Sequence, residues 1–135
     1  MPDEADGLEG ARRLRSRFSF AVKQPARCKN RVRAALVESN TAFERLVNLS
    51  RARRLDVLER IGGPWQVLGA GRKRLAKVAR GATAKELDAL WESLSQATRP
   101  TDGQVGAEAR VFPMLARRIR ALEADAEALS DLAAA

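Results

Sequence analysis

The sequence has no histidine, no tyrosine and one cysteine, so two residue types that are often used in acid-base and covalent catalysis are absent and a third occurs once. One cysteine permits no intramolecular disulfide, and without histidine the usual zinc-ligand sets cannot be assembled within one chain. No apolar run approaches the roughly 20 residues of a membrane-spanning helix. The first residues are acidic, whereas a secretion signal begins with basic residues. We therefore expect a cytoplasmic, non-enzymatic protein with no metal, no other cofactor and no membrane contact.

Large apolar residues are also scarce. Leu, Ile, Val and Phe number 31 of the 135 residues, just above the level at which charged chains tend to be disordered. The 25 alanines add little buried area each. We therefore expect one domain with a thin core, which is most stable when it is bound to a partner.

Ala, Leu, Arg and Glu dominate the sequence, and no stretch alternates polar and apolar residues over any length. This composition predicts an all-α fold, a single small helical bundle of about five helices. Residues 1–24 are interpreted as an acidic start followed by a basic helical arm. Residues 25–135 are interpreted as the bundle, with a loop at 98–107 that is rich in Pro, Gly and Asp.

Apolar spacing and helix-breaking residues predict the helices along the chain. A first helix at 3–18 is followed by a break at 19–25, because proline disfavours helix in the residue before it. Residues 26–61 form either one long helix or two helices joined near Ser50. A helix then runs from Pro64 to about Arg80, since proline suits the first helical position.

Two signals predict the remaining helices. Thr83 and Glu86 have the spacing of a capping box, which predicts the start of a short helix. The final helix is expected to carry Pro113 in its first turn and to pack lengthwise on another helix. Its apolar seam consists of Phe112, Leu115, Ile119, Leu122, Ala126, Leu129 and Ala133.

Positive charge is abundant: Lys and Arg number 25 against 17 acidic residues, and 20 of the 25 are arginine. The forked guanidinium group suits bidentate contacts to phosphate or carboxylate. A GC-rich genome also enriches arginine and alanine, so the composition alone leaves both explanations open.

The charge is concentrated in two segments. Residues 11–34 carry nine positive side chains and no acid, and residues 62–82 carry five and no acid, whereas residues 1–10 have a net charge of −4. Closely spaced phosphates are a natural partner for such segments, and counterion release favours their association. Solvated faces of a basic bundle are the simpler alternative. The candidate nucleic-acid-binding residues are Arg13, Arg17, Lys23, Arg27, Lys29, Arg31, Arg33, Arg72, Lys73, Arg74, Lys77, Arg80, Arg117 and Arg120.

Two other features suggest chemistry that the rest of the sequence does not support. Cys28 lies among basic residues, but no imidazole is available as its base, so a packing role is favoured. The glycines at 69 and 71 precede a basic run, yet the spacing of a phosphate-binding loop and its preceding strand are missing. We therefore assign no catalytic residue and no nucleotide-binding loop.

The stripe Arg72-Lys73-Arg74-x-x-Lys77-x-x-Arg80, the run Arg117-Arg118-Ile119-Arg120 and the helical pattern together resemble the small helical subunits of CRISPR effector complexes. The resemblance covers size, charge and helicity and includes no diagnostic motif, so no residue role is carried over. It implies a subunit whose basic faces support a guide duplex or a displaced strand.

Two functions are consistent with these features. The first is a helical subunit of a larger ribonucleoprotein or nucleoprotein assembly that binds the RNA or DNA backbone and contacts other subunits or copies of itself. Because aromatic residues are few, such contacts would be independent of base sequence. The alternative is a protein-interaction module, namely a scaffold, chaperone or inhibitor, that binds an acidic protein surface.

Overall fold

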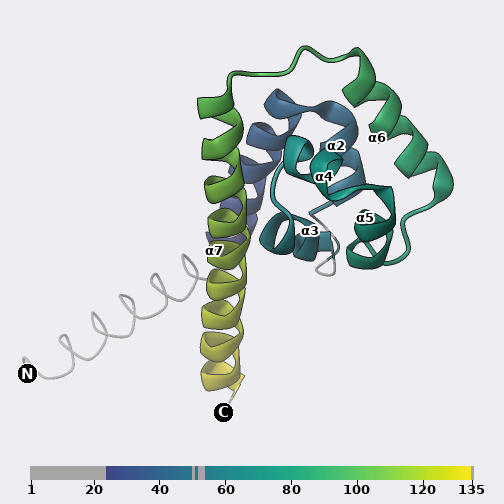
Figure 1. Ribbon diagram of the computed structural model, residues 1–135. Coiled ribbons are helices and arrows are strands. Elements are labelled where there is room, and N and C mark those ends of the chain that lie inside the picture. The colour runs from purple at the N-terminus through teal and green to yellow at the C-terminus, as the bar shows by residue number, and fades with distance from the viewer. Residues whose placement is uncertain (1–23, 50, 52–53, 135) are drawn as a thin grey trace, which may run out of the picture. The chain divides into compact units, whose positions relative to one another are not determined.

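A computed structural model describes residues 24–49, 51 and 54–134 (Figure 1). Within these residues the chain forms helices and no strand, which confirms the all-α class. The described residues divide into two compact units, one within Met1–Lys29 and Ile119–Ala135, of which residues 24–29 and 119–134 are described, and the other within Asn30–Arg118. The predicted helix at 3–18 lies outside the described residues.

The described residues form seven helical segments, so the expectation of about five helices is wrong. None of the described helices is long and apolar enough to span a membrane. The segments are a helix at 24–39, α2 (Thr41–Val47), α3 (Leu55–Arg60), α4 (Pro64–Ala70), α5 (Arg72–Val78), α6 (Ala84–Gln96) and α7 (Asp102–Ala134).

Asn40 and Asn48 divide residues 26–61, which were expected to form one or two helices. Asn40 has an extended backbone, and its Oδ1 accepts a hydrogen bond from the Phe43 backbone N–H at 2.9 Å, so it caps α2. Asn48 ends α2 in the left-handed region with φ of 43°. The stretch therefore contains three helices, although its apolar spacing runs on through Asn40.

The sequence predicted a break that ends at Pro25, but the structure shows no break there. Gln24 and Pro25 are both helical, and the Pro25 side chain is buried. The preference against helix before proline is an average tendency, which the burial of an apolar ring can override. The rest of the expected break, at 19–23, lies outside the described residues.

Gly71 divides the helix that was expected to run from Pro64 to Arg80. Its φ is 95°, a conformation that side-chain-bearing residues rarely adopt, and α4 ends there while α5 begins at Arg72. The single-helix expectation is therefore wrong, because the backbone of Gly71 leaves the helical conformation instead of only weakening the helix.

The last two helices differ in how well their starts were predicted. The Thr83 Oγ1 accepts from the Glu86 backbone N–H at 3.1 Å, which confirms the capping box of α6. The expected loop at 98–107 is too long, because α7 already begins at Asp102. Thr101 Oγ1 accepts from the Gln104 backbone N–H at 3.2 Å, so it caps α7 in the same way.

Pro113 lies inside α7 and not in its first turn, a further error that follows from the misplaced helix start. An interior proline costs a helix about 3 kcal/mol. Phe112 and Ala116 are buried on either side of it, and their packing offsets that cost. Along the predicted seam Phe112 and Ile119 are buried, Leu122 and Leu129 are half-buried and Ala133 is exposed.

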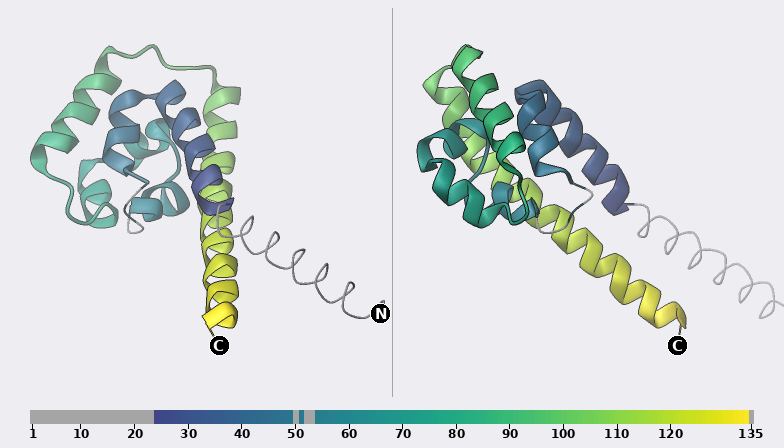
Figure 2. Two further views of the ribbon diagram at one scale, coloured as in Figure 1. Left: turned by 180° about the vertical axis from the view of Figure 1, so that it is seen from behind. Right: turned by 90° about the vertical axis from the view of Figure 1, so that its right-hand side faces the viewer.

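The unit formed by Asn30–Arg118 holds most of the buried apolar side chains. In it α2 packs against α3 and α6, α4 packs against α5 and α6, and α3 packs against α5 (Figures 1 and 2). The rings of Phe43 and Phe112 meet edge to face with centroids 6.5 Å apart. Gln66 Nε2 donates to the Val105 carbonyl at 2.8 Å and thereby joins α4 to α7.

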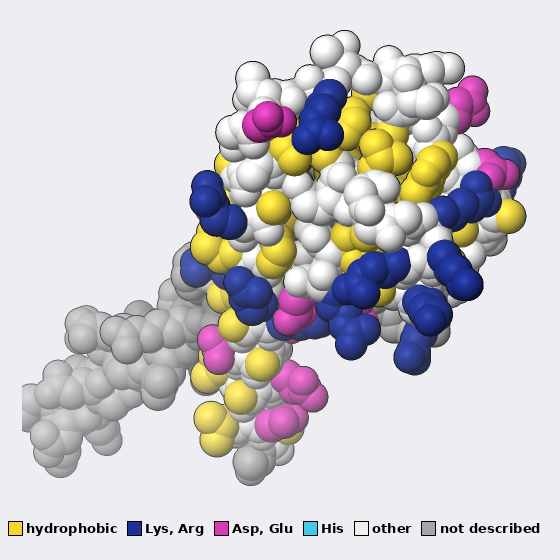
Figure 3. Space-filling model, in the orientation of Figure 1, with side chains coloured by type: hydrophobic (Ala, Val, Ile, Leu, Met, Phe, Trp, Pro, Cys, Tyr) yellow, Lys and Arg dark blue, Asp and Glu magenta, His cyan; other side chains and the backbone are white. Residues whose placement is uncertain are grey.

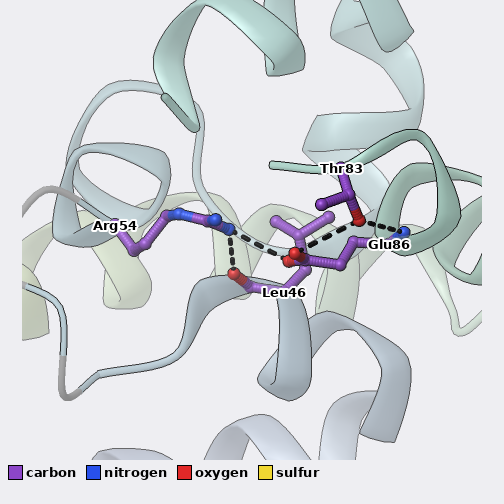
Figure 4. Close-up of polar contacts among 4 residues, drawn as sticks. All are labelled: Leu46, Arg54, Thr83 and Glu86. Atoms are coloured by element: carbon purple, nitrogen blue, oxygen red, sulfur yellow. Dashed lines mark hydrogen bonds and ion pairs between the residues drawn. The ribbon is translucent and has the colours of Figure 1, made fainter. Parts of the chain in front are cut away.

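Arg54 is the one charged residue that is buried in the described chain, with 1% of its surface exposed. Its Nη1 donates to the Leu46 carbonyl at 2.6 Å and lies 3.3 Å from the Glu86 carboxylate (Figure 4). Leu46 is in the last turn of α2, where carbonyls have no partner within the helix. The guanidinium therefore joins the end of α2 to the start of α6.

In the other unit the structure describes residues 24–29 and 119–134, all of them helical. Lys29 Nζ lies 2.8 Å from Glu123 Oε1, so the two segments share an ion pair.

Candidate nucleic-acid interface

The helix α5 presents its positive side chains to solvent because its apolar residues occupy the opposite side. Leu75 and Val78 are buried at i, i+3 spacing, and Ala79 directly after the helix is buried as well. Lys73, Arg74 and Lys77 are therefore left exposed, and Arg80 is exposed in the turn that follows.

A fifth cation joins this surface from α3. Because α3 packs against α5, Arg60 in the last turn of α3 comes to line the same hollow as Arg74, Lys77, Val78 and Arg80. In the space-filling view, Lys and Arg side chains gather over this part of the unit (Figure 3). We call the set Arg60, Lys73, Arg74, Lys77 and Arg80 the cationic face.

The five side chains of the cationic face share the lack of an acidic partner among the described residues. None of its five side chains takes part in an ion pair or hydrogen bond with the part of the chain that the structure describes. Elsewhere in the same unit, by contrast, acids accompany Arg33, Arg54 and Arg72. An unneutralised group of cations produces a positive potential that attracts an anionic partner.

Arg72 belongs to α5 but not to the cationic face. Its guanidinium contacts the Asp88 carboxylate at 2.5 Å and the Ala84 carbonyl at 3.4 Å, both on α6. The side chain therefore connects α5 to α6, and its charge is already balanced.

The other predicted residues have varied surroundings. Arg13, Arg17 and Lys23 lie outside the described residues. Lys29 pairs with Glu123, and Arg33 lies 3.7 Å from Glu44. Arg31 and Arg117 are exposed. Arg27 and the half-buried Arg120 each interact with other groups of the chain.

Of the predicted residues, the structure thus brings Lys73, Arg74, Lys77 and Arg80 together on one surface with no acidic partner. Sequence reasoning missed Arg60, because it stands in a stretch where positive and negative charges alternate. The available signal was its position two residues before Gly62-Gly63, since a chain reversal there brings the end of one helix back beside a later one.

A second depression lies in the same unit between the 24–39 helix and α7. It has a volume of about 330 Å³, and its walls include Val111, Phe112 and Leu115 together with Glu108. Burial raises the pKa of the Glu108 carboxyl, and the hydrogen bond from Ser39 Oγ at 3.2 Å opposes this rise. The chain has no histidine that could act as a base beside Ser39.

Metal chemistry finds no support in the described residues, where no group of three or more Cys, Asp or Glu side chains could hold an ion. Cys28 is half-buried and forms no disulfide.

No family model, no curated protein and no solved structure matches this chain. The resemblance to small CRISPR effector subunits therefore stays a prediction.

Proposed function

We propose that this protein is a non-enzymatic subunit of a nucleoprotein assembly, and that its cationic face binds the sugar-phosphate backbone of a nucleic acid. The observation that carries the proposal is the grouping of five exposed cations from α3, α5 and the turn after α5 with no acidic partner among the described residues.

Electrostatic and chemical arguments favour a phosphate backbone as the partner. Phosphate contacts position a nucleic acid without reading its bases, which suits a surface of Arg and Lys without exposed aromatic side chains. Three of the five cations are arginines, whose planar forks match phosphate oxygens. The contact is therefore expected to be independent of base sequence.

Salt dependence tests this proposal directly. If about five phosphates are neutralised, the binding constant for duplex DNA should fall roughly 10²- to 10³-fold between about 50 and 200 mM salt. Fluorescence anisotropy with labelled DNA and RNA of arbitrary sequence measures this slope. No binding at low salt, or an affinity that does not change with salt, would refute the proposal and favour an acidic protein as the partner.

A matched pair of variants tests whether the binding is located on the cationic face. Replacing Lys73, Arg74 and Lys77 with alanine should reduce the magnitude of the log-log salt slope by about 2.7. The control replaces three exposed cations of other helices, Arg45, Lys85 and Arg110, and removes the same net charge. Equal losses in the two triple variants would show attraction by net charge alone and would contradict the assignment.

A further inference from the structure

The cationic face has two parts that differ in geometry. Lys73 is exposed on α5 but does not line the hollow, whereas Arg60, Arg74, Lys77 and Arg80 line it. Four cations from α3, α5 and the turn after α5 thus line one hollow, and Val78 contributes an apolar part of its wall. A single helix face would have placed these cations in a row along the surface.

A row of cations on a surface and a hollow lined by cations suit different phosphate groups. Along a strand the phosphodiesters carry one negative charge each and are spread out, so they match cations that are spread along a surface. A terminal phosphomonoester carries about −1.5 to −2 charge at pH 7 and three acceptor oxygens on one phosphorus atom. Several guanidinium and ammonium groups can therefore contact it at the same time.

Steric access to the hollow also favours a terminal phosphate over a phosphodiester. The middle of a strand has sugars and bases on both sides of every phosphate, which hinders its entry into a hollow. A terminal phosphate protrudes from the strand and can enter end on. We propose that the hollow formed by Arg60, Arg74, Lys77 and Arg80 binds the terminal phosphate of a nucleic-acid strand, and that Lys73 contacts the adjoining backbone. This inference rests on the proposed function and specifies which part of the nucleic acid is bound.

The test compares one oligonucleotide in four forms, with a phosphate at the 5′ end, at the 3′ end, at both ends or at neither. Exposed charge pairs contribute modestly, so we expect at least one phosphorylated form to bind about five-fold more tightly than the unphosphorylated form. Equal affinity for all four forms would overturn the terminal-phosphate site and leave backbone binding intact. If none of the forms binds, the proposed function fails as well.

Two single substitutions separate the hollow from the rest of the cationic face. Arg60→Gln and Lys73→Gln each remove one positive charge, but only Arg60 lines the hollow. Arg60→Gln should abolish most of the preference for the phosphorylated end, whereas Lys73→Gln should weaken all four forms alike. Lys77→Gln provides a second variant of the hollow, and circular dichroism verifies that each protein is folded. Identical effects of Arg60→Gln and Lys73→Gln would contradict the assignment.

The preference should also follow the charge of the terminal phosphate. Its second proton binds with a pKa of about 6, so the preference should decrease between about pH 7.5 and pH 5. The groups that line the hollow are Arg60, Arg74, Lys77 and Arg80, and the chain has no histidine that would change its charge over this range. A preference that stays constant with pH would argue against recognition of the dianion.

Free phosphate distinguishes a strand end from a small anion. Inorganic phosphate or a nucleoside monophosphate should compete only weakly, because neither provides the adjoining backbone that contacts Lys73. Competition as strong as that of the phosphorylated oligonucleotide would overturn the strand-end assignment in favour of a small-anion site.

Discussion

The Arg54 contacts and the cationic face use the same type of residue for opposite purposes. Arg54 is almost completely buried, and its guanidinium contacts the Leu46 carbonyl and the Glu86 carboxylate. Arg74 is exposed and has no such partner among the described residues. A buried cation without partners costs several kcal/mol, whereas an exposed one costs little because water solvates it. The buried Arg54 therefore holds helices together, whereas exposed arginines such as Arg74 are available for a ligand.

The largest expected effect on stability comes from Arg54→Met. The substitution removes the group that joins the end of α2 to the start of α6 and leaves the Leu46 carbonyl without its partner. We expect the free energy of unfolding to fall by about 3 kcal/mol, because breaking a buried polar network is far costlier than losing an exposed pair. Urea denaturation followed by circular dichroism measures the loss.

The same substitution on the cationic face is the matched control. Arg74→Met should change the free energy of unfolding by less than about 0.5 kcal/mol, because the side chain is exposed. It should instead weaken nucleic-acid binding. Losses of similar size in both variants would eliminate the distinction between structural and ligand-binding arginines.

Sequence reasoning predicted the helical class and the start of α6, since helix content and the Thr83 cap depend on neighbouring residues. It misjudged the number of helices where one residue decides the path of the chain. The left-handed Gly71 and the capping Asn40 both interrupt apolar spacing that otherwise continues. The early start of α7 was within reach, because Thr101 and Gln104 have the same cap spacing as Thr83 and Glu86.

The sequence predicted the part of the cationic face that lies on one helical stretch, but not the part that depends on packing between helices. Lys73, Lys77 and Arg80 share one side of a helical stretch, so their grouping is visible in the sequence. Whether a cation is neutralised, however, depends on which helix packs beside it. That packing gives Arg72 a partner in Asp88 and adds Arg60 from α3, and neither result follows from charge runs.

The next largest effect is expected for Thr83→Ala, which tests the other end of the Arg54 contacts. The substitution removes the cap of α6 and also the hydroxyl that donates to the Glu86 carboxylate at 3.4 Å. Stability should fall by about 1 kcal/mol, the usual cost of losing a cap. Thermal unfolding measures it, and Thr83→Ser should retain most of the stability. A loss in Thr83→Ser as large as in Thr83→Ala would show that the hydroxyl is not responsible.

Arg72→Gln examines a side chain that lies between the two classes. It is partly exposed yet paired with Asp88, so its loss should reduce stability by only about 0.5 kcal/mol, and the reduction should shrink as salt screens the pair. Because Asp88 already balances this charge, nucleic-acid affinity should fall less than in Arg74→Gln. Equal losses of affinity in the two variants, measured by anisotropy at one salt concentration, would place Arg72 on the binding surface.

The smallest expected effect concerns Glu108, an acid that has no cationic partner among the described residues. Burial raises the pKa of its carboxyl above the usual 4.5, so the folded protein takes up a proton at a higher pH than the unfolded chain does. Above the folded pKa the buried charge reduces stability by a constant amount. As the pH falls through the folded pKa towards 4.5, protonation progressively relieves this cost. Glu108→Gln should therefore be slightly more stable than the wild type at pH 7, by less than about 0.5 kcal/mol, and the difference should shrink as the pH falls. Thermal unfolding of both proteins across this range measures the difference. A variant that is less stable at pH 7 would mean that the Ser39 hydrogen bond to the charged carboxylate outweighs its burial.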